Sequence, residues 1–193
     1  MNKSQNKIYY LYIAFSFIFI AVTTNYLNLY DIIFVANQTD SLSYTAIAKN
    51  APLLSGENFF ILNNKEKLIQ QHVAQRFVIP YIIGSIAHFL NIDFFLIFKL
   101  FTLLFIFFYI FLINILIKKL NFNFKVSILF FSILFLNPYV IRYHIFQPIM
   151  AHDMLFFCFG LLFSLTMISK KYFSNLLISI ITIYLRQTSI ALL

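Results

Sequence analysis

Two groups of ionisable side chains in this sequence have the composition to carry out chemistry. The first joins Asp40, in the first polar stretch of the chain, with Arg76 in a later polar segment. The second lies between residues 142 and 153 and contains Arg142, His144 and Asp153. A carboxylate beside several cations suits a reaction in which the carboxylate accepts a proton while the cations hold a phosphate. These residues are therefore candidates for an acid–base site that acts on a phosphate-bearing substrate.

The residues around Asp40 predict a short helix that begins at Asp40 and ends before Pro52. Asp is favoured at a helix start because its carboxylate accepts hydrogen bonds from free backbone N–H groups, and proline disfavours helical geometry in the residue before it. Steps of four and three residues from Asp40 place an apolar stripe on one helix face: Tyr44, Ile47, Ala48 and Ala51. A carboxylate at the head of such a stripe costs free energy unless it is paired. Asp40 is therefore either a functional residue or only a helix cap, and the local sequence favours neither.

The composition is strongly apolar. Only 10% of the residues are charged and 62% are hydrophobic, whereas about a quarter of an average soluble domain is charged. Several apolar runs reach the roughly 20 residues that a helix needs to cross a bilayer, so we predict an all-α, polytopic helical membrane protein. The net charge of +8 comes largely from lysines at the ends of apolar runs. This pattern sets membrane orientation, so no nucleic-acid partner is expected. The single cysteine, Cys158, excludes a disulfide framework.

The apolar runs predict about five spans, near residues 8–24, 94–117, 126–140, 148–168 and 174–193. A long outer loop over 25–93 is expected to carry juxtamembrane helices at about 40–51 and 81–90. The segment 81–90 is too short to cross a core about 30 Å thick and is apolar on one face, so we expect it to lie flat in the interface. The lysine clusters then all fall on the cytoplasmic side: Lys3/Lys7, Lys118/Lys119/Lys125 and Lys170/Lys171.

This topology places the chain in the plasma membrane (the inner membrane of a bacterium) with its N-terminus in the cytoplasm. The candidate residues then share the outer side: Asp40, His72, Arg76, Arg142, His144, His152 and Asp153. Arg186 falls in the outer leaflet, and an ionisable residue in a span usually faces a partner or a wet cavity. Lys99, near the outer end of the span 94–117, is expected to extend its amine to the headgroups.

Each candidate also has a structural explanation. Asp153 could cap the helix that follows it, and Arg76 and Arg142 could anchor the protein to headgroups, which is the commoner role of an interfacial arginine. His72 and His88 fit interfacial polar residues better than ligands. No spacing of His, Asp or Glu suggests a metal site, and the sequence contains no Ser-His-Asp array, phosphate loop or dinucleotide fingerprint.

Four stretches occur in a familiar order along the chain: Asp40-x-x-x-Tyr44-x-x-Ile47-Ala48, Gln75-Arg76-Phe77-Val78-Ile79-Pro80, His152-Asp153-Met154-Leu155-Phe156-Phe157 and Leu185-Arg186-Gln187-Thr188. Together with one early span, an acidic residue in the first outer loop and a flat helix, they resemble the GT-C superfamily of membrane glycosyltransferases. That superfamily includes the aminoarabinose transferases of lipid A and the protein O-mannosyltransferases. The last stretch is similar to the Arg-Gln-Thr segment of the dolichyl-linked glucosyltransferases.

The resemblance implies an inverting enzyme that moves a sugar from a polyprenyl-phosphate donor to a hydroxyl of a glycan, lipid or protein acceptor at the outer face. Asp40 would be the general base and Asp153 a second acidic residue. Four cations would be candidates for binding the donor phosphate: Arg76, Arg142, His144 and Arg186. Neither a cofactor nor a divalent metal is implied. The expected partners are membrane lipids, the lipid-linked donor and the acceptor.

Members of the superfamily usually have more spans than the five expected here, and the sequence ends within apolar residues at Leu193. We therefore expect residues 1–193 to form a single, incomplete membrane domain, the N-terminal part of such an enzyme. Two other functions fit the same pattern. The outer charges could line the substrate path of a transporter or flippase, or they could anchor a membrane protein that has no catalytic activity.

Overall fold

The computed structural model describes residues 3–24, 39–52, 62–63, 66–67 and 76–185. This part of the chain is almost entirely helical, in agreement with the predicted all-α fold. A two-stranded antiparallel pair, β1 (Leu62–Asn63) and β2 (Glu66–Lys67), is the exception, and it pairs Leu62 with Lys67 and Asn63 with Glu66. The arrangement of the helices decides where the candidate residues meet.

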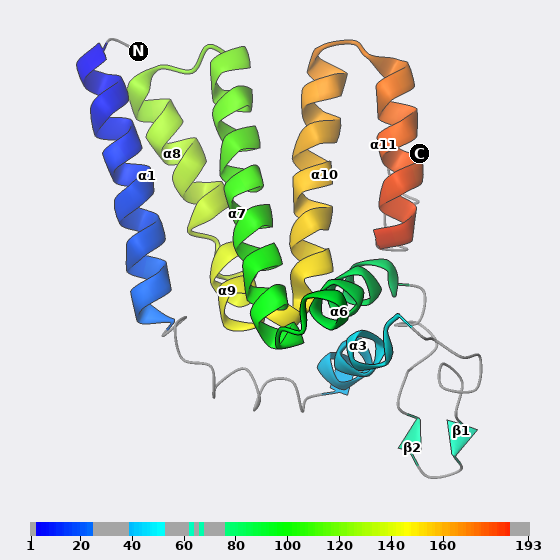
Figure 1. Ribbon diagram of the computed structural model, residues 1–193. Helices are drawn as coiled ribbons and strands as arrows, with labels where there is room; N and C mark the ends of the chain where they lie inside the picture. Colours follow the sequence, from blue (N-terminus) through cyan, green and yellow to red (C-terminus); the bar gives the residue numbers. More distant parts are fainter. Residues whose placement is uncertain (1–2, 25–38, 53–61, 64–65, 68–75, 186–193) are drawn as a thin grey trace.

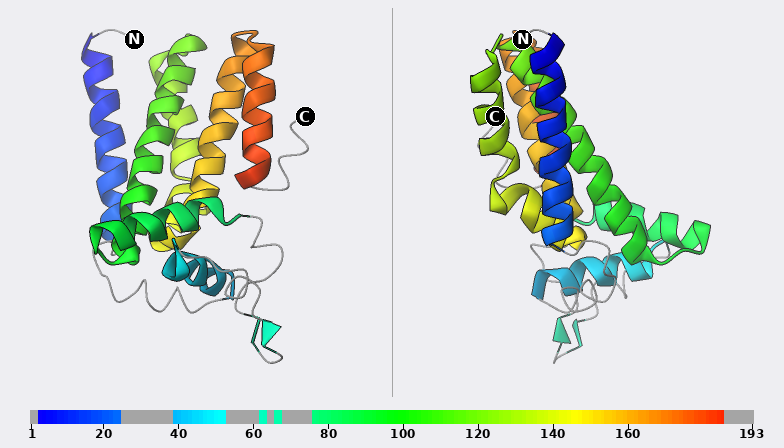
Figure 2. Two further views of the ribbon diagram at one scale, coloured as in Figure 1. Left: turned by 45° about the vertical axis from the view of Figure 1, so that its right-hand side comes forward. Right: turned by 90° about the vertical axis from the view of Figure 1, so that its left-hand side faces the viewer.

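Five helices stand side by side and form an upright bundle (Figures 1 and 2). They are α1 (Lys3–Thr23), α7 (Phe94–Lys119), α8 (Phe124–Phe135), α10 (Ala151–Ile168) and α11 (Tyr172–Leu185). Two more helices, α3 (Thr39–Asn50) and α6 (Val78–Leu90), lie across one end of this bundle. Between α8 and α10 the chain makes a π-helical turn (Pro138–Arg142), the short helix α9 (Tyr143–Phe146) and a 3₁₀ turn (Pro148–Met150).

Within the described residues, three helical segments are long and apolar enough to cross a membrane: Ser4–Thr23, Phe94–Lys119 and Pro148–Ile168. A fourth span results if α8 and the segment Val140–Phe146, which meet at a 43° bend, are one broken span. The bend has a local cause, because Pro138 has no backbone N–H to continue the helix of α8. The predicted spans 8–24, 94–117 and 148–168 thus match candidate spans, and the predicted span 126–140 is interrupted.

The fifth predicted span, 174–193, corresponds in part to α11, an apolar helix of 14 residues. Residues 186–193 lie outside the described part of the chain. Among the described residues, the structure thus has three to four candidate membrane spans, and the fifth predicted span lies partly outside them. The outward surfaces of the spanning helices are apolar, as lipid contact requires; Leu11, Phe15 and Val22 of α1 are all more than two-thirds exposed.

The described lysines of the predicted cytoplasmic clusters gather at the end of the bundle opposite α3 and α6 (Figure 1). Lys118 and Lys119 occupy the last turn of α7, and Lys170 and Lys171 lie in the turn between α10 and α11. The Lys119 amine donates a hydrogen bond to Ser169 Oγ over 2.6 Å, which joins two of these turns. Positive charge is thus concentrated at one end of the bundle, the arrangement expected if that end faces the cytoplasm.

The flat helix predicted at 81–90 is present as α6 (Val78–Leu90), which lies across the end of the bundle. Its buried face packs on the bundle and on α3, and it consists of Ile79, Pro80, Ile83, Gly84 and Ala87. Its other face leaves Ile82, Phe89 and Leu90 exposed, with Phe89 77% exposed. A helix of this length lying across the span ends, with apolar residues on its free face, suits the membrane interface.

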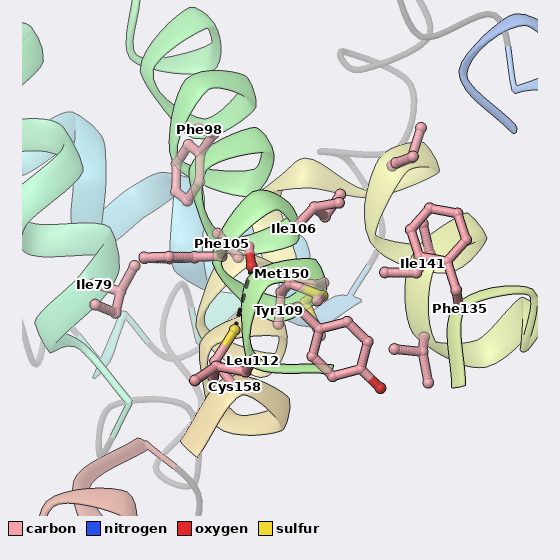
Figure 3. Packing of buried hydrophobic residues seen from close by; sticks show 14 of the residues in the cluster. Ile79, Phe98, Phe105, Ile106, Tyr109, Leu112, Phe135, Ile141, Met150 and Cys158 are labelled. Carbon is pink, nitrogen blue, oxygen red and sulfur yellow. Dashed lines mark hydrogen bonds between the residues drawn. The ribbon is translucent and has the colours of Figure 1, made fainter. Parts of the chain in front are cut away.

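The core lies where α7 packs against α10 and the turns around Pro148 (Figure 3). Phe105 and Tyr109 of α7 face Met150 and Cys158, and Phe135 stands near Ile141 across the bend after α8. The thiol of Cys158 donates a hydrogen bond to the Phe105 carbonyl over 3.3 Å. This packing fixes the outer end of α10, where the candidate site lies.

Candidate functional site

The helix predicted around Asp40 places one aromatic residue on the head of α10. The predicted stripe is confirmed: Tyr44, Ile47, Ala48 and Ala51 are all buried. The Tyr44 ring packs on the imidazole of His152, with the ring centroids 4.3 Å apart and the planes at 52°. Tyr44 is 0% exposed and His152 is 1% exposed. This contact joins residues that are far apart in the sequence, and it packs α3 against the first turn of α10, which belongs to a candidate span.

Asp153 completes this group, because it follows His152 in the first turn of α10. The carboxylate Oδ1 of Asp153 lies 3.5 Å from His152 Nε2, and both side chains are buried. The two form an ion pair when the imidazole is protonated. We call Tyr44, His152 and Asp153 the outer cluster. A carboxylate beside an imidazole orients the ring, so the pair brings an acidic and a basic side chain together at the start of α10.

Asp153 does not cap a helix in the way the sequence suggested. The helix α10 begins at Ala151, before Asp153, and its N-cap residue is Met150 without a side-chain cap hydrogen bond. Asp153 instead lies inside the first turn, where the positive end of the helix dipole stabilises a carboxylate. Similarly, α3 begins at Thr39, so Asp40 is inside its first turn rather than before it. Asp40 lies one turn before Tyr44 in α3; its side chain is outside the described part of the structure.

The cations predicted to hold a phosphate are placed differently from one another. Arg142 ends the π-helical turn and is exposed. Arg76 lies just before α6 and is half-buried, and its Nε is buried without a hydrogen bond from the described residues. His144 is buried, its Nδ1 is hydrogen-bonded to the Val140 carbonyl, and its ring packs edge-on against Phe157 at 5.7 Å. Arg186 and His72 lie outside the described residues.

Lys99 is a buried cation that the sequence interpretation placed wrongly. It was expected to reach the headgroups, but it is 7% exposed in α7. Lys99 lies one helical turn nearer the start of α7 than Thr102. The Thr102 hydroxyl donates a hydrogen bond to the Pro148 carbonyl over 3.0 Å. Residues three apart share a helix face, so Lys99 is on the face of α7 that packs on the head of α10.

The sequence and structure of this chain were compared with those of known proteins. The chain matches no protein family model, no curated protein and no solved structure. Within the described residues, no three His, Cys, Asp or Glu side chains are placed so that they could hold a metal ion. The candidate functional residues of the described chain therefore lie in the outer cluster, at Lys99 and in the helix that carries Asp40.

Proposed function

We propose that this protein is an integral membrane glycosyltransferase that moves a sugar from a polyprenyl-phosphate donor to an acceptor hydroxyl. The observation that carries the proposal is the packing of α3 against the start of α10, where the Tyr44 ring contacts His152 beside Asp153. This contact holds the helix that carries Asp40 across the ends of the candidate spans. A lipid-linked donor presents its phosphate at the same level, because the headgroups lie at the ends of the spans.

In the proposed reaction, Asp40 is the general base. The acceptor hydroxyl attacks the anomeric carbon of the sugar, and its proton passes to the carboxylate of Asp40 as the new C–O bond forms. The bond between the anomeric carbon and the phosphate oxygen breaks, and its electron pair leaves with the polyprenyl phosphate. A single displacement of this kind inverts the anomeric centre, unlike the two-step retaining route.

The remaining candidates have supporting roles in this proposal. The leaving phosphate gains negative charge in the transition state, so nearby cations lower the barrier; Arg76, Arg142, His144 and Arg186 are the proposed cations. Asp153 and His152 keep a second proton-accepting pair at the same end of the bundle. Tyr44 positions α3, since its ring is completely buried against His152.

Replacement of Asp40 by Asn tests the proposal. The protein in membrane vesicles is given a set of polyprenyl-phosphate sugars, and release of polyprenyl phosphate is measured by mass spectrometry. General-base catalysis contributes about 10²- to 10⁴-fold, so Asp40→Asn should reduce release by at least about 10²-fold. The matched control is Asp93→Asn, because Asp93 is exposed at the same end of the bundle and only caps α7.

Equal release by the wild type and Asp40→Asn would remove Asp40 as the base. Movement of the intact lipid-linked sugar across the vesicle membrane, without cleavage, would replace the enzyme by a flippase-type transporter. If the wild type acts on none of the donors and moves none of them, the proposed reaction is wrong for this chain.

A further inference from the structure

A groove that the proposed reaction does not use lies between the two flat helices. It has a volume of about 220 Å³ beside the crossing of α3 and α6. Small buried residues form its floor: Ala48, Ala51, Gly84 and Ala87. The exposed residues Lys49, His88 and Asn91 line its rim. The groove is thus a shallow hollow that is lined by small side chains and by the polar side chains of Lys49, His88 and Asn91.

The polar groups at the rim suit an anion. Lys49 supplies a positive charge, the imidazole of His88 supplies an N–H donor, and the side-chain amide of Asn91 supplies two more. Asp93, two residues after Asn91, already accepts a hydrogen bond from the Phe95 N–H over 3.0 Å. Pockets for drug-sized ligands begin at about 300 Å³, so this groove is large enough for a small headgroup and too small for a large ligand.

The surroundings of the groove indicate that the anion carries acyl chains. The helix α6 lies across the ends of the candidate spans, so the groove is at headgroup level. Next to the His88 and Asn91 rim, Phe89, Leu90 and Ile92 are exposed by 77%, 59% and 40%. Exposed apolar side chains at this level are stabilised when lipid chains cover them.

From this combination we infer that the groove binds the phosphate headgroup of an anionic glycerophospholipid in the leaflet that contacts α6. Lys49 and His88 hold the phosphate, and the exposed residues of α6 contact the acyl chains. This lipid is separate from the sugar donor, and its binding does not depend on the proposed reaction. It would fix α3 and α6 at the membrane surface.

Native mass spectrometry of the detergent-solubilised protein tests this inference with added phosphatidylglycerol or phosphatidylcholine. The wild type should retain phosphatidylglycerol in preference to phosphatidylcholine. A lysine near a membrane surface contributes enough to change binding about fivefold, so the double variant Lys49→Gln/His88→Gln should lose at least about fivefold in affinity. Lys49→Arg should keep the affinity, since it keeps the charge. Ala87→Leu should lower it, because the larger side chain fills the floor of the groove.

The matched control is Lys7→Gln/Lys125→Gln, which removes two exposed lysines at the other end of the bundle. An equal loss in this control would show that general charge attracts the lipid, and the groove assignment would be overturned. Unchanged retention in Lys49→Gln/His88→Gln, or equal retention of both lipids by the wild type, would also overturn it. If inorganic phosphate at the same concentration displaces phosphatidylglycerol, the groove binds a free anion and the lipid assignment is wrong.

Discussion

Gly84 is the point at which α3 and α6 come closest, and its replacement by alanine gives the sharpest test of this arrangement. A Cβ atom at Gly84 would lie 2.0 Å from the carbonyl oxygen of Ala48 and 2.6 Å from its carbonyl carbon and Cα. All three atoms belong to the backbone of α3, so no side chain can rotate away. Ordinary van der Waals contact begins at 3.4 Å, so α3 must withdraw by about 1.4 Å.

The structure also sets the size of the expected effect. Overpacking that forces the backbone to move costs about 1–3 kcal/mol, and for a chain of this length each kcal/mol lowers the melting temperature by about 2–4 °C. Gly84→Ala should therefore lower the melting temperature by about 2–12 °C. One opposing effect is present, because alanine is favoured over glycine inside a helix by about 0.5–1 kcal/mol.

Gly160 provides a control that cancels this opposing effect. It also lies inside a helix, α10, but a Cβ atom there would meet nothing within 4 Å. Gly160→Ala should leave the melting temperature unchanged or raise it. The assay is thermal unfolding of both variants in the same detergent, followed by circular dichroism. If Gly84→Ala is as stable as Gly160→Ala, the close crossing of α3 and α6 is wrong.

Two further predictions concern the membrane topology and the hydrogen bond that joins α7 to the turn before α10. In intact cells, an impermeant maleimide should label Lys49→Cys. It should label Lys119→Cys only after the cells are lysed. Labelling of both variants in intact cells would mean that α6 does not lie flat. The native Cys158 is buried and should add little background. Thr102→Val leaves the buried Pro148 carbonyl without its hydrogen bond, which should cost about 1–3 kcal/mol in unfolding free energy. Ser164→Ala should be nearly neutral by the same thermal measurement, because the Gly160 carbonyl that it contacts is within its own helix.

Local sequence patterns predicted the elements whose cause is local. The stripe from Tyr44 to Ala51 was predictable because helical spacing alone places these residues on one face, and all of them are buried. The flat orientation of α6 followed from its length, since a helix of 13 residues is too short to cross the membrane core. The bend after α8 followed from Pro138, and it decides whether the described residues contain three or four candidate spans.

Contacts between distant segments were not predictable from one sequence. Tyr44 and His152 meet only because the turns before α10 bring its first residues next to α3, and no local pattern near either residue indicates the other. The same reason explains Lys99. Snorkelling is the usual behaviour of a lysine near a span end, and only the packing of α7 on α10 shows that this lysine is buried instead. Gly84 gave no signal either, because its partner Ala48 lies in another helix.

Among the described residues, the buried polar groups are distributed as we would expect if the proposed reaction takes place at the membrane surface. Along the interface of α10 and α11, the buried polar residues are neutral, as in Asn175, Ser179 and Thr182, and the Thr182 hydroxyl bonds to the Ser179 carbonyl of its own helix. Small polar residues of this kind commonly serve helix packing in membranes. The buried lysine, histidine and aspartate side chains of the described chain lie instead at one end of the bundle: Lys99, His144, His152 and Asp153. A path for a charged substrate needs polar partners at every depth, whereas a lipid-linked donor needs them only where its phosphate lies.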